Sequence, residues 1–315
     1  KYFFRYASEF GFQSFPSVKT LETVTDDPRE LNPFSYVMEK HQRNYGGNGK
    51  IAKYMQAAYR YPENFSDFVY ASQLLQADGI RYGVEHYRRN RGRCMGAIYW
   101  QLNDCWPVIS WSSIDYYGRW KALHYYAKRF FAPVMLSCEE QSWMTVEADM
   151  NRQHFEFEKS IRLNVTNETL SARKVLVKFA VRDAGAKILR QEEQWVEVPA
   201  LSSVWMDKVE LPEIDSFNEY VSYEAWENEK IISQGTVIFS YPKYFHYQDP
   251  KLSVRVEGDE IIVSAEAYAK SVEIQNENDD LILEDNYFDM NAGERRVKIL
   301  DGKPENLKVR SVYDI

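Results

Sequence analysis

Over roughly the first 130 residues, segments whose apolar residues have the spacing of a strand alternate with segments whose apolar residues have the spacing of a helix. Residues 2–8 form an aromatic-rich run that predicts a strand, and apolar residues near helical spacing predict one long helix over 64–90. The short apolar run 94–100 predicts a buried strand of a parallel sheet, and the pattern over 120–131 predicts a second helix. The order strand, helix, strand, helix indicates a parallel sheet with right-handed crossovers.

Two such strand–helix units are too few to cover both faces of a sheet or to close a barrel. We therefore expect this region to be a piece of something larger. A long, polar, aromatic-rich connection separates the first strand from the first helix and includes residues 26–28 and 45–49. Loops of that length inside a compact domain are usually functional.

The pattern changes after about Pro133, where strict alternation replaces helical spacing. The first group of predicted strands indicates an immunoglobulin-like β-sandwich and covers 145–148, 154–158, 161–165, 175–181, 195–198, 220–226 and 235–239. A linker is expected over 240–244. The second group indicates a smaller sandwich and covers 252–256, 261–265, 271–274, 296–300 and 307–312.

The predicted fold class is therefore multidomain, α/β followed by all-β. We place the α/β part at 1–133, an immunoglobulin-like β-sandwich at 134–242, and a smaller C-terminal one at 243–315. The acidic run over 276–280 is expected to be a solvated turn, because its oxygen-bearing residues lack the regular spacing of an EF-hand loop.

The composition of the chain argues against several classes of binding partner. The net charge of −8 repels nucleic acid and anionic lipid, and no apolar stretch is long enough to predict a membrane span. Three cysteines without paired spacing predict buried free thiols, and the five histidines show no metal-ligand spacing, so no metal or cofactor is expected. The 23 Tyr and 8 Trp residues suit sugar binding at a few positions, although most are expected in the cores.

Candidate catalytic residues follow both N-terminal strands. Glu9 lies where the first strand ends, among aromatic residues and beside Gln13, and the second strand ends in the segment 100–111. Active sites of parallel β/α folds form at the carboxyl ends of strands, so both clusters are expected to face the same opening. A carboxylate near a tryptophan platform and side-chain amides is typical of retaining glycosidases, which use two carboxylates about 5–5.5 Å apart. The alternatives are that Glu9 pairs with a cation inside a barrel and that Trp100 belongs to a core.

Two long motifs resemble one family in the expected order. The segment Ser8–Pro16 closely resembles the nucleophile segment of β-mannosidases in glycoside hydrolase family 2. The segment Gly96–Asp115 is similar to the eighth-strand segment of the same enzymes, and the resemblance continues over Gly118–Tyr126. The two downstream sandwiches also fit the C-terminal modules of this family.

The resemblance implies that the first strand and residues 96–100 are strands seven and eight of a (β/α)8 TIM barrel. It implies that Glu9 is the nucleophile and forms a covalent mannosyl intermediate with a β-mannoside oligosaccharide. It further implies that substrate is bound by Trp100, Asn103, Asp104, Trp106 and Trp111, with a structural role as the alternative for Trp111.

This chain departs from the family in one large respect. The acid/base of the family is a glutamate after an asparagine at the end of barrel strand four, and nothing here corresponds to it. We therefore expect a fragment that is inactive alone and whose partner is the missing N-terminal part of the same enzyme. Another family 2 activity, such as β-glucuronidase or β-galactosidase, and a non-catalytic β-sandwich interaction module stay as alternatives. Homo-oligomerisation and compartment are left open, with a bacterial cytoplasm favoured.

Overall fold

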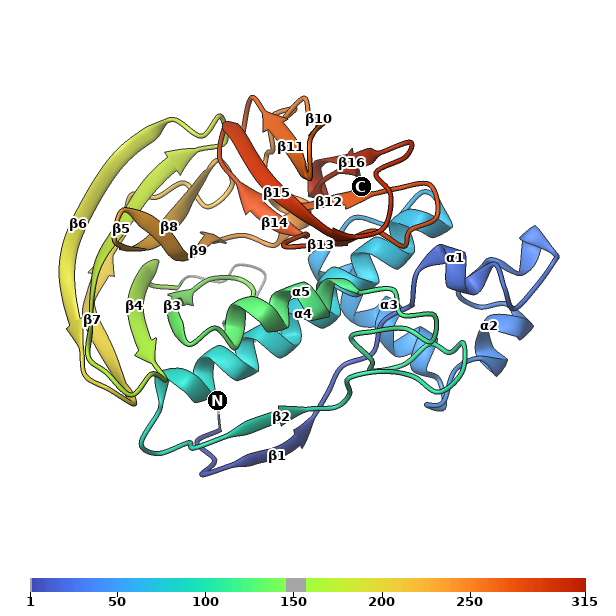
Figure 1. Ribbon diagram of the computed structural model, residues 1–315, viewed down its shortest axis with the longest axis horizontal. Coiled ribbons are helices and arrows are strands. Elements are labelled where there is room, and N and C mark those ends of the chain that lie inside the picture. The colour runs from blue at the N-terminus through green and yellow to red at the C-terminus, as the bar shows by residue number, and fades with distance from the viewer. Residues whose placement is uncertain (1, 146–156) are drawn as a thin grey trace. The chain divides into compact units, whose positions relative to one another are not determined.

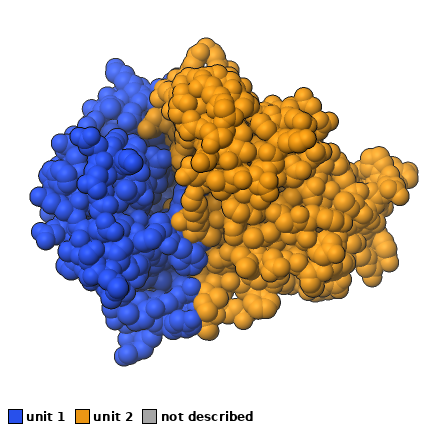
Figure 2. Space-filling model, in the orientation of Figure 1, with its two compact units in different colours: residues 1–7, 83–97, 129–248 blue, residues 8–82, 98–128, 249–315 orange. Residues whose placement is uncertain are grey.

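The structure is a computed structural model, and it describes residues 2–145 and 157–315 (Figure 1). The chain forms two compact units (Figure 2). Unit 1 contains residues 1–7, 83–97 and 129–248, and unit 2 contains residues 8–82, 98–128 and 249–315. The three-part division expected from the sequence stays a prediction.

Unit 1 contains an antiparallel β-sandwich. One sheet has the strand order β3-β4-β7 and the other the order β6-β5-β8-β9. The strands are β3 (Val134–Gln141), β4 (Ser160–Asn167), β5 (Arg173–Asp183), β6 (Ile188–Val198), β7 (Ser202–Glu210), β8 (Glu219–Glu227) and β9 (Lys230–Ile238). The sequence predicted five of these, while β3 and β7 were missed. Of the strands expected at 145–148 and 154–158, residues 146–156 lie outside the described residues, and Thr145 and residues 157–158 are not in strands.

The core of this sandwich explains why the alternating segments became strands. On β5, Val175, Val177, Phe179 and Val181 are all buried in the core, whereas Leu176 and Lys178 between them are only partly buried. Successive side chains on a strand point to opposite faces, so a period of two places one apolar row inside. Burying each such side chain contributes roughly 1.5–3 kcal/mol.

Unit 2 contains a smaller sandwich. Its sheets have the strand orders β10-β11-β15-β13 and β14-β12-β16. The strands are β10 (Ser253–Glu257), β11 (Glu260–Ala265), β12 (Ala269–Gln275), β13 (Ile282–Leu283), β14 (Phe288–Met290), β15 (Gly293–Asp301) and β16 (Lys308–Arg310). Each of the five strands that the sequence predicted here overlaps an observed one, and only the short strands β13 and β14 were missed.

The described part of the chain contains more helices than the sequence predicted. The long helix is confirmed as α4 (Phe65–Arg89), with the Asn64 side chain accepting the Asp67 N–H at 2.9 Å as an N-cap, and the second is α5 (Ala122–Phe130). The prediction of a long loop before α4 was partly wrong, because this stretch contains α3 (Gly47–Ala58). Helix α3 buries Ile51 and Met55 on one face. Shorter elements in the same stretch are α1 (Val18–Leu21), η1 (Pro28–Glu30) and α2 (Tyr36–Lys40).

The strand pair β1 (Ala7–Phe10) and β2 (Ala97–Tyr99) positions the candidate site. The Met95 N–H donates to the Arg5 carbonyl at 2.8 Å, and the Trp100 N–H donates to the Phe10 carbonyl at 2.8 Å. Hydrogen bonds that advance together along both strands mean that the strands are parallel, as predicted. Figure 1 shows them side by side.

Two details of this pair differ from the prediction. The first strand begins at Ala7 rather than Tyr2, and β2 is not buried, since Ile98 is half exposed. A sheet of two strands offers little area for elements to pack against both of its faces. None of the helices in the described part of the chain has the length and apolar character needed to cross a bilayer.

Candidate active site

Glu9 lies near the end of β1, and its side chain is exposed. Two residues later the chain passes very close to the end of β2. A Cβ added to Gly11 would lie 2.4 Å from the carbonyl oxygen of Trp100 and 3.0 Å from Cδ1 of Trp111. Glycine therefore occupies position 11 because of this close approach, which brings the end of β1 against both tryptophans.

The segment after β2 closes into a loop. The Trp100–Gln101 peptide bond is cis, and the Gln101 N–H donates to the Trp111 carbonyl at 3.1 Å. This loop surrounds an open pocket of about 510 Å³. The pocket brings together five of the six expected site residues, namely Trp100, Asn103, Asp104, Trp106 and Trp111.

Glu9 is not among the residues that line this pocket. It directly precedes Phe10, whose carbonyl accepts the Trp100 N–H, so it lies at the same edge of the strand pair. The pocket is also lined by Arg43, which the sequence analysis missed because it lies in the long connection, far from either motif.

Asp104 is buried and is held by its own loop. One carboxylate oxygen accepts hydrogen bonds from the Ser110 hydroxyl at 2.7 Å and from the Gln101 amide at 3.2 Å. The other accepts from the Ser112 hydroxyl at 2.5 Å. A buried carboxylate with three donors is well compensated, so Asp104 organises the loop that carries the tryptophans.

The three tryptophan rings of the pocket differ in their contacts and in their exposure. Trp106 stacks on the His41 ring at a centroid distance of 4.8 Å, and the Arg43 guanidinium lies 4.4 Å from its ring centroid. His41 Nδ1 lies 2.6 Å from the Pro107 carbonyl, which can only accept, so Nδ1 carries the proton. Trp111 is partly buried, whereas Trp100 is 49% exposed. Trp100 therefore presents the most open aromatic surface of the pocket.

Gln76 of α4 joins the two segments that carry the site. It is fully buried, and its Nε2 donates to the carbonyls of Phe12 at 2.8 Å and Trp111 at 3.0 Å. Its Oε1 accepts from the Ser14 hydroxyl at 2.7 Å. Gln76 was not predicted from the sequence, although a glutamine among the buried positions of an amphipathic helix was the available signal.

Lys121 makes a second connection between the same segments. Its buried Nζ donates to the carbonyls of Ser14 at 3.3 Å and Ser110 at 3.5 Å. Burial lowers the pKa of Lys121 from 10.5 to about 8, while the nearby carboxylates of Asp104 and Asp115 oppose that shift. At neutral pH the Lys121 ammonium therefore donates to the backbone of both segments, although burial disfavours its charge.

The cysteines and acidic groups form no metal centre in the described part of the chain. All three cysteines are unpaired, and Cys94 and Cys138 are buried as expected. Cys105 is exposed, which contradicts the prediction of a buried thiol, because it follows Asp104 on the open side of the loop.

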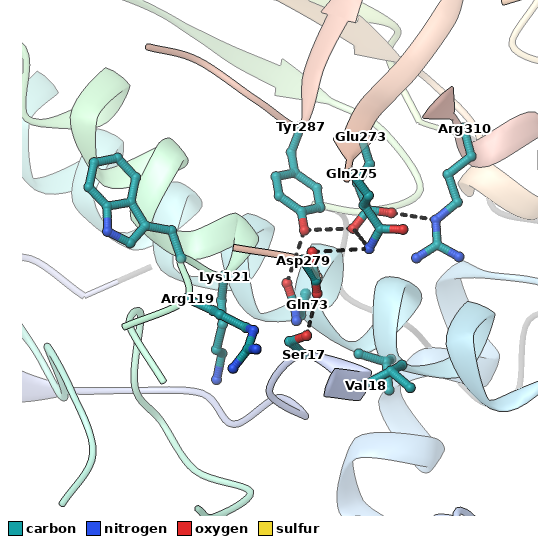
Figure 3. Close-up of a pocket in the computed structure, with 12 residues that line it drawn as sticks. Ser17, Val18, Gln73, Arg119, Lys121, Glu273, Gln275, Asp279, Tyr287 and Arg310 are labelled. Atoms are coloured by element: carbon teal, nitrogen blue, oxygen red, sulfur yellow. Dashed lines mark hydrogen bonds and ion pairs between the residues drawn. The ribbon is translucent and has the colours of Figure 1, made fainter. Parts of the chain in front are cut away.

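A second, nearly closed cavity of about 10 Å³ in unit 2 has a different character (Figure 3). Glu273 is buried there and accepts from the Tyr287 hydroxyl at 2.7 Å and from the Arg310 guanidinium. Asp279 accepts from the Ser17 hydroxyl. Such a volume holds about one water molecule, so these residues form a structural network that anchors the C-terminal strands of unit 2.

This network corrects the prediction for the acidic run 276–280. Asn276 is buried and Asp279 is partly buried, so the segment is not simply a solvated turn. Burial and the nearby Glu273 carboxylate raise the pKa of Asp279 to about 6. The run is drawn inward at Asp279, whose carboxylate accepts the Ser17 hydroxyl.

Known proteins match this chain along nearly its whole length. Residues 159–244 match the family model described as a Mannosidase Ig/CBM-like domain, and residues 247–315 match one described as an Ig-fold domain. Beta-mannosidase B of Thermothelomyces thermophilus is 30% identical over an alignment of 336 residues. The alignment covers 98% of this chain and 39% of that protein. Beta-mannosidase of Capra hircus is 39% identical over 144 residues, which cover 42% of this chain and 16% of that protein.

Solved structures give a consistent result. The crystal structure of a β-D-mannosidase from Dictyoglomus thermophilum matches with a TM-score of 0.83 and 26% identity, covering 98% of this chain and 37% of that one. The exo-chitosanase CsxA of Amycolatopsis orientalis matches with a TM-score of 0.70 at 15% identity, covering 95% of this chain and 42% of that one, which shows a shared fold alone. This chain thus spans about two fifths of the length of the relatives that match it throughout.

Proposed function

Since the chain corresponds to the C-terminal portion of a β-mannosidase of glycoside hydrolase family 2, we propose that the longer protein removes terminal β-linked mannose with retention of configuration. Glu9 is the nucleophile of this double displacement. The observation that carries the proposal is the parallel pairing of β1 and β2, which puts Glu9 and the tryptophan-lined pocket at the same edge.

The chemistry has two steps. A Glu9 carboxylate oxygen bonds to the anomeric carbon as the bond to the leaving oxygen breaks, and the leaving oxygen takes a proton from an acid. Water then attacks the anomeric carbon, giving its proton to the same acid/base and releasing Glu9. The acid/base lies outside this chain in the proposal, so this chain supplies the nucleophile and part of the sugar pocket.

We assign β1 and β2 to strands seven and eight of a (β/α)8 barrel. Parallel direction and the position of the site at the strand ends support this assignment. Trp100 packs its open ring against the C–H face of the terminal mannose, and Asn103, Trp106 and Trp111 contact the same sugar or its neighbour. Asp104 acts mainly by holding the loop, because its oxygens already accept hydrogen bonds within it.

The proposal is tested with Glu9→Gln in the full-length product of the gene. We expect loss of p-nitrophenyl β-mannoside hydrolysis and loss of covalent labelling by a 2-deoxy-2-fluoro mannoside, read by intact mass. Glu63→Gln, at an exposed position before α4, is the matched control and should keep both. Labelling that persists in Glu9→Gln would remove Glu9 from the nucleophile role.

The 315-residue chain by itself should not turn over p-nitrophenyl β-mannoside above background, because the base that activates water in the second step is missing. Side-by-side assays with β-glucuronide and β-galactoside substrates distinguish the alternative family 2 activities. Turnover of any of these substrates by the isolated chain would contradict the proposal that the acid/base lies outside this chain.

A further inference from the structure

One face of the sheet β6-β5-β8-β9 in unit 1 carries a row of apolar side chains that the core does not use. Leu176 of β5 pairs with Trp195 of β6 and with Trp226 of β8, and Trp226 pairs with Ile231 of β9. Paired residues point to the same face of a sheet. The neighbouring Val175 points into the core, so these four residues, the tryptophan row, lie on the outer face.

The tryptophan row is accessible in unit 1. Trp195 is 58% exposed and Ile231 is 42% exposed, while Leu176 and Trp226 are partly exposed. Single exposed apolar residues are ordinary on protein surfaces. Two tryptophans aligned across three adjacent strands form a contiguous apolar strip, which is typical of a binding surface.

Neighbouring charges hold the two rings in place. Lys174 Nζ lies 5.2 Å from the Trp195 ring centroid, and Lys178 Nζ lies 5.5 Å from that of Trp226. The Trp226 indole N–H donates to a Glu224 carboxylate oxygen at 2.8 Å. Rings that are already oriented lose less freedom when a ligand binds, which favours binding.

A polar row runs beside the tryptophan row on the same face. It contains Glu193, Lys178, Glu224 and Gln234, one from each strand in the order of the sheet. Lys178 pairs with Glu193 at 3.2 Å, so most of the charge is compensated within the row. Carboxylates and an amide beside an apolar strip match the hydroxyl groups of a neutral polyol better than they match a polyelectrolyte.

We propose that the tryptophan row and the polar row bind an extended, neutral, β-1,4-linked oligosaccharide lying across the strands. Trp195 and Trp226 are two strands apart, roughly 9.5 Å at ordinary strand spacing, which is close to the length of one disaccharide repeat of such a chain. Each tryptophan then stacks on the C–H face of every second sugar, and the polar row bonds to hydroxyls along one side.

This site belongs to unit 1 and requires nothing of Glu9. Only the choice of a mannose-based ligand rests on the proposed function, so a glucose-based ligand of the same linkage is tested beside it. The protein is the 315-residue chain, titrated with β-1,4-mannohexaose and with cellohexaose. Calorimetry and tryptophan fluorescence report binding.

We expect binding of at least one hexaose, weakened roughly 3- to 10-fold by Trp195→Ala and again by Trp226→Ala. Trp195→Phe should retain most of the affinity, because it keeps an aromatic face. The matched control is Trp205→Ala on β7, in the other sheet of the same sandwich, which should bind normally. Thermal unfolding confirms that each variant is folded.

Three results would overturn the proposal. One is the absence of binding at millimolar concentrations of both hexaoses. Another is binding that is lost in Trp100→Ala but kept in Trp195→Ala, which would move the sugar to the candidate active site and leave the proposed function standing. The third is a wild-type dimer that Trp195→Ala converts to a monomer, which would make the row a contact between copies of the chain.

Discussion

The side-chain nitrogen of Gln76 lies 3.0 Å from the carbonyl oxygen of Trp111 and 2.8 Å from that of Phe12. A single residue of α4 thereby joins the segment after β1 to the segment after β2. Neither segment forms a regular ladder with the other at this point, so buried side chains supply the partners that their backbone carbonyls need.

Replacing Gln76 with methionine tests this role. The volume is nearly kept, but the carbonyls of Phe12 and Trp111 lose a buried donor, so the free energy of unfolding should fall by about 1–3 kcal/mol. Urea denaturation of the chain measures it. Gln191→Met at an exposed position of β6 is the control and should change stability by less than about 0.5 kcal/mol. Equal effects of both changes would show that the buried amide contributes nothing specific.

Gly11 gives a steric test of the same region. In Gly11→Ala the new Cβ meets the Trp100 carbonyl oxygen, a backbone atom, so the ends of β1 and β2 must separate. Such overpacking costs about 1–3 kcal/mol, and in the full-length protein a shift near 1 Å lowers kcat by roughly 100-fold. Gly49→Ala is the control, because nothing lies near its Cβ and alanine should stabilise α3 by roughly 0.5–1 kcal/mol. Unchanged stability and turnover in Gly11→Ala would refute the close contact.

The pKa of Lys121, lowered to about 8 by burial, predicts a pH effect of known sign. Between pH 8 and 10.5 the folded state binds fewer protons than the unfolded state, so this residue makes stability rise with pH. The stability difference between wild type and Lys121→Met should therefore grow in favour of wild type across that window and stay flat below it.

Urea denaturation at several pH values from 7 to 10 measures this difference. Lys53→Met, at an exposed position of α3, should show no such growth. A wild-type advantage that is constant with pH would mean that Lys121 keeps its ordinary pKa in the folded protein.

Removing Arg310 should cost more stability than removing an arginine of an exposed ion pair. Its guanidinium bonds to the buried Glu273, so Arg310→Met leaves that carboxylate uncompensated and should cost about 3–5 kcal/mol. Arg296 pairs with Glu257 and Glu260 at the surface, and Arg296→Met should cost no more than about 1 kcal/mol. Adding Glu273→Gln to Arg310→Met should recover part of the loss. Comparable losses for Arg310→Met and Arg296→Met would contradict the structural role of the buried network.

Local pattern was sufficient for most regular elements of this chain. The period of two placed β5, β8 and β11, and the capped, amphipathic stretch after Asn64 placed α4, because these signals depend on residues close in sequence. Helix α3 was missed because its glycine-rich start at Gly46 and Gly47 resembles a loop. Its burial of Ile51 and Met55 is a tertiary effect.

The candidate site divides in the same way. The sequence by itself identified the two motifs around Glu9 and Trp100, the order of the strands that carry them, and the family they resemble. It could not reveal that Asp104 is held by Ser110 and Ser112, that Gln76 and Lys121 join the two motifs, or that Arg43 lines the pocket. The partners of Asp104 lie only six and eight positions away within one loop, whereas Gln76 and Lys121 contact residues much farther away in the sequence. In both cases only the folded chain decides which of its many polar groups meet.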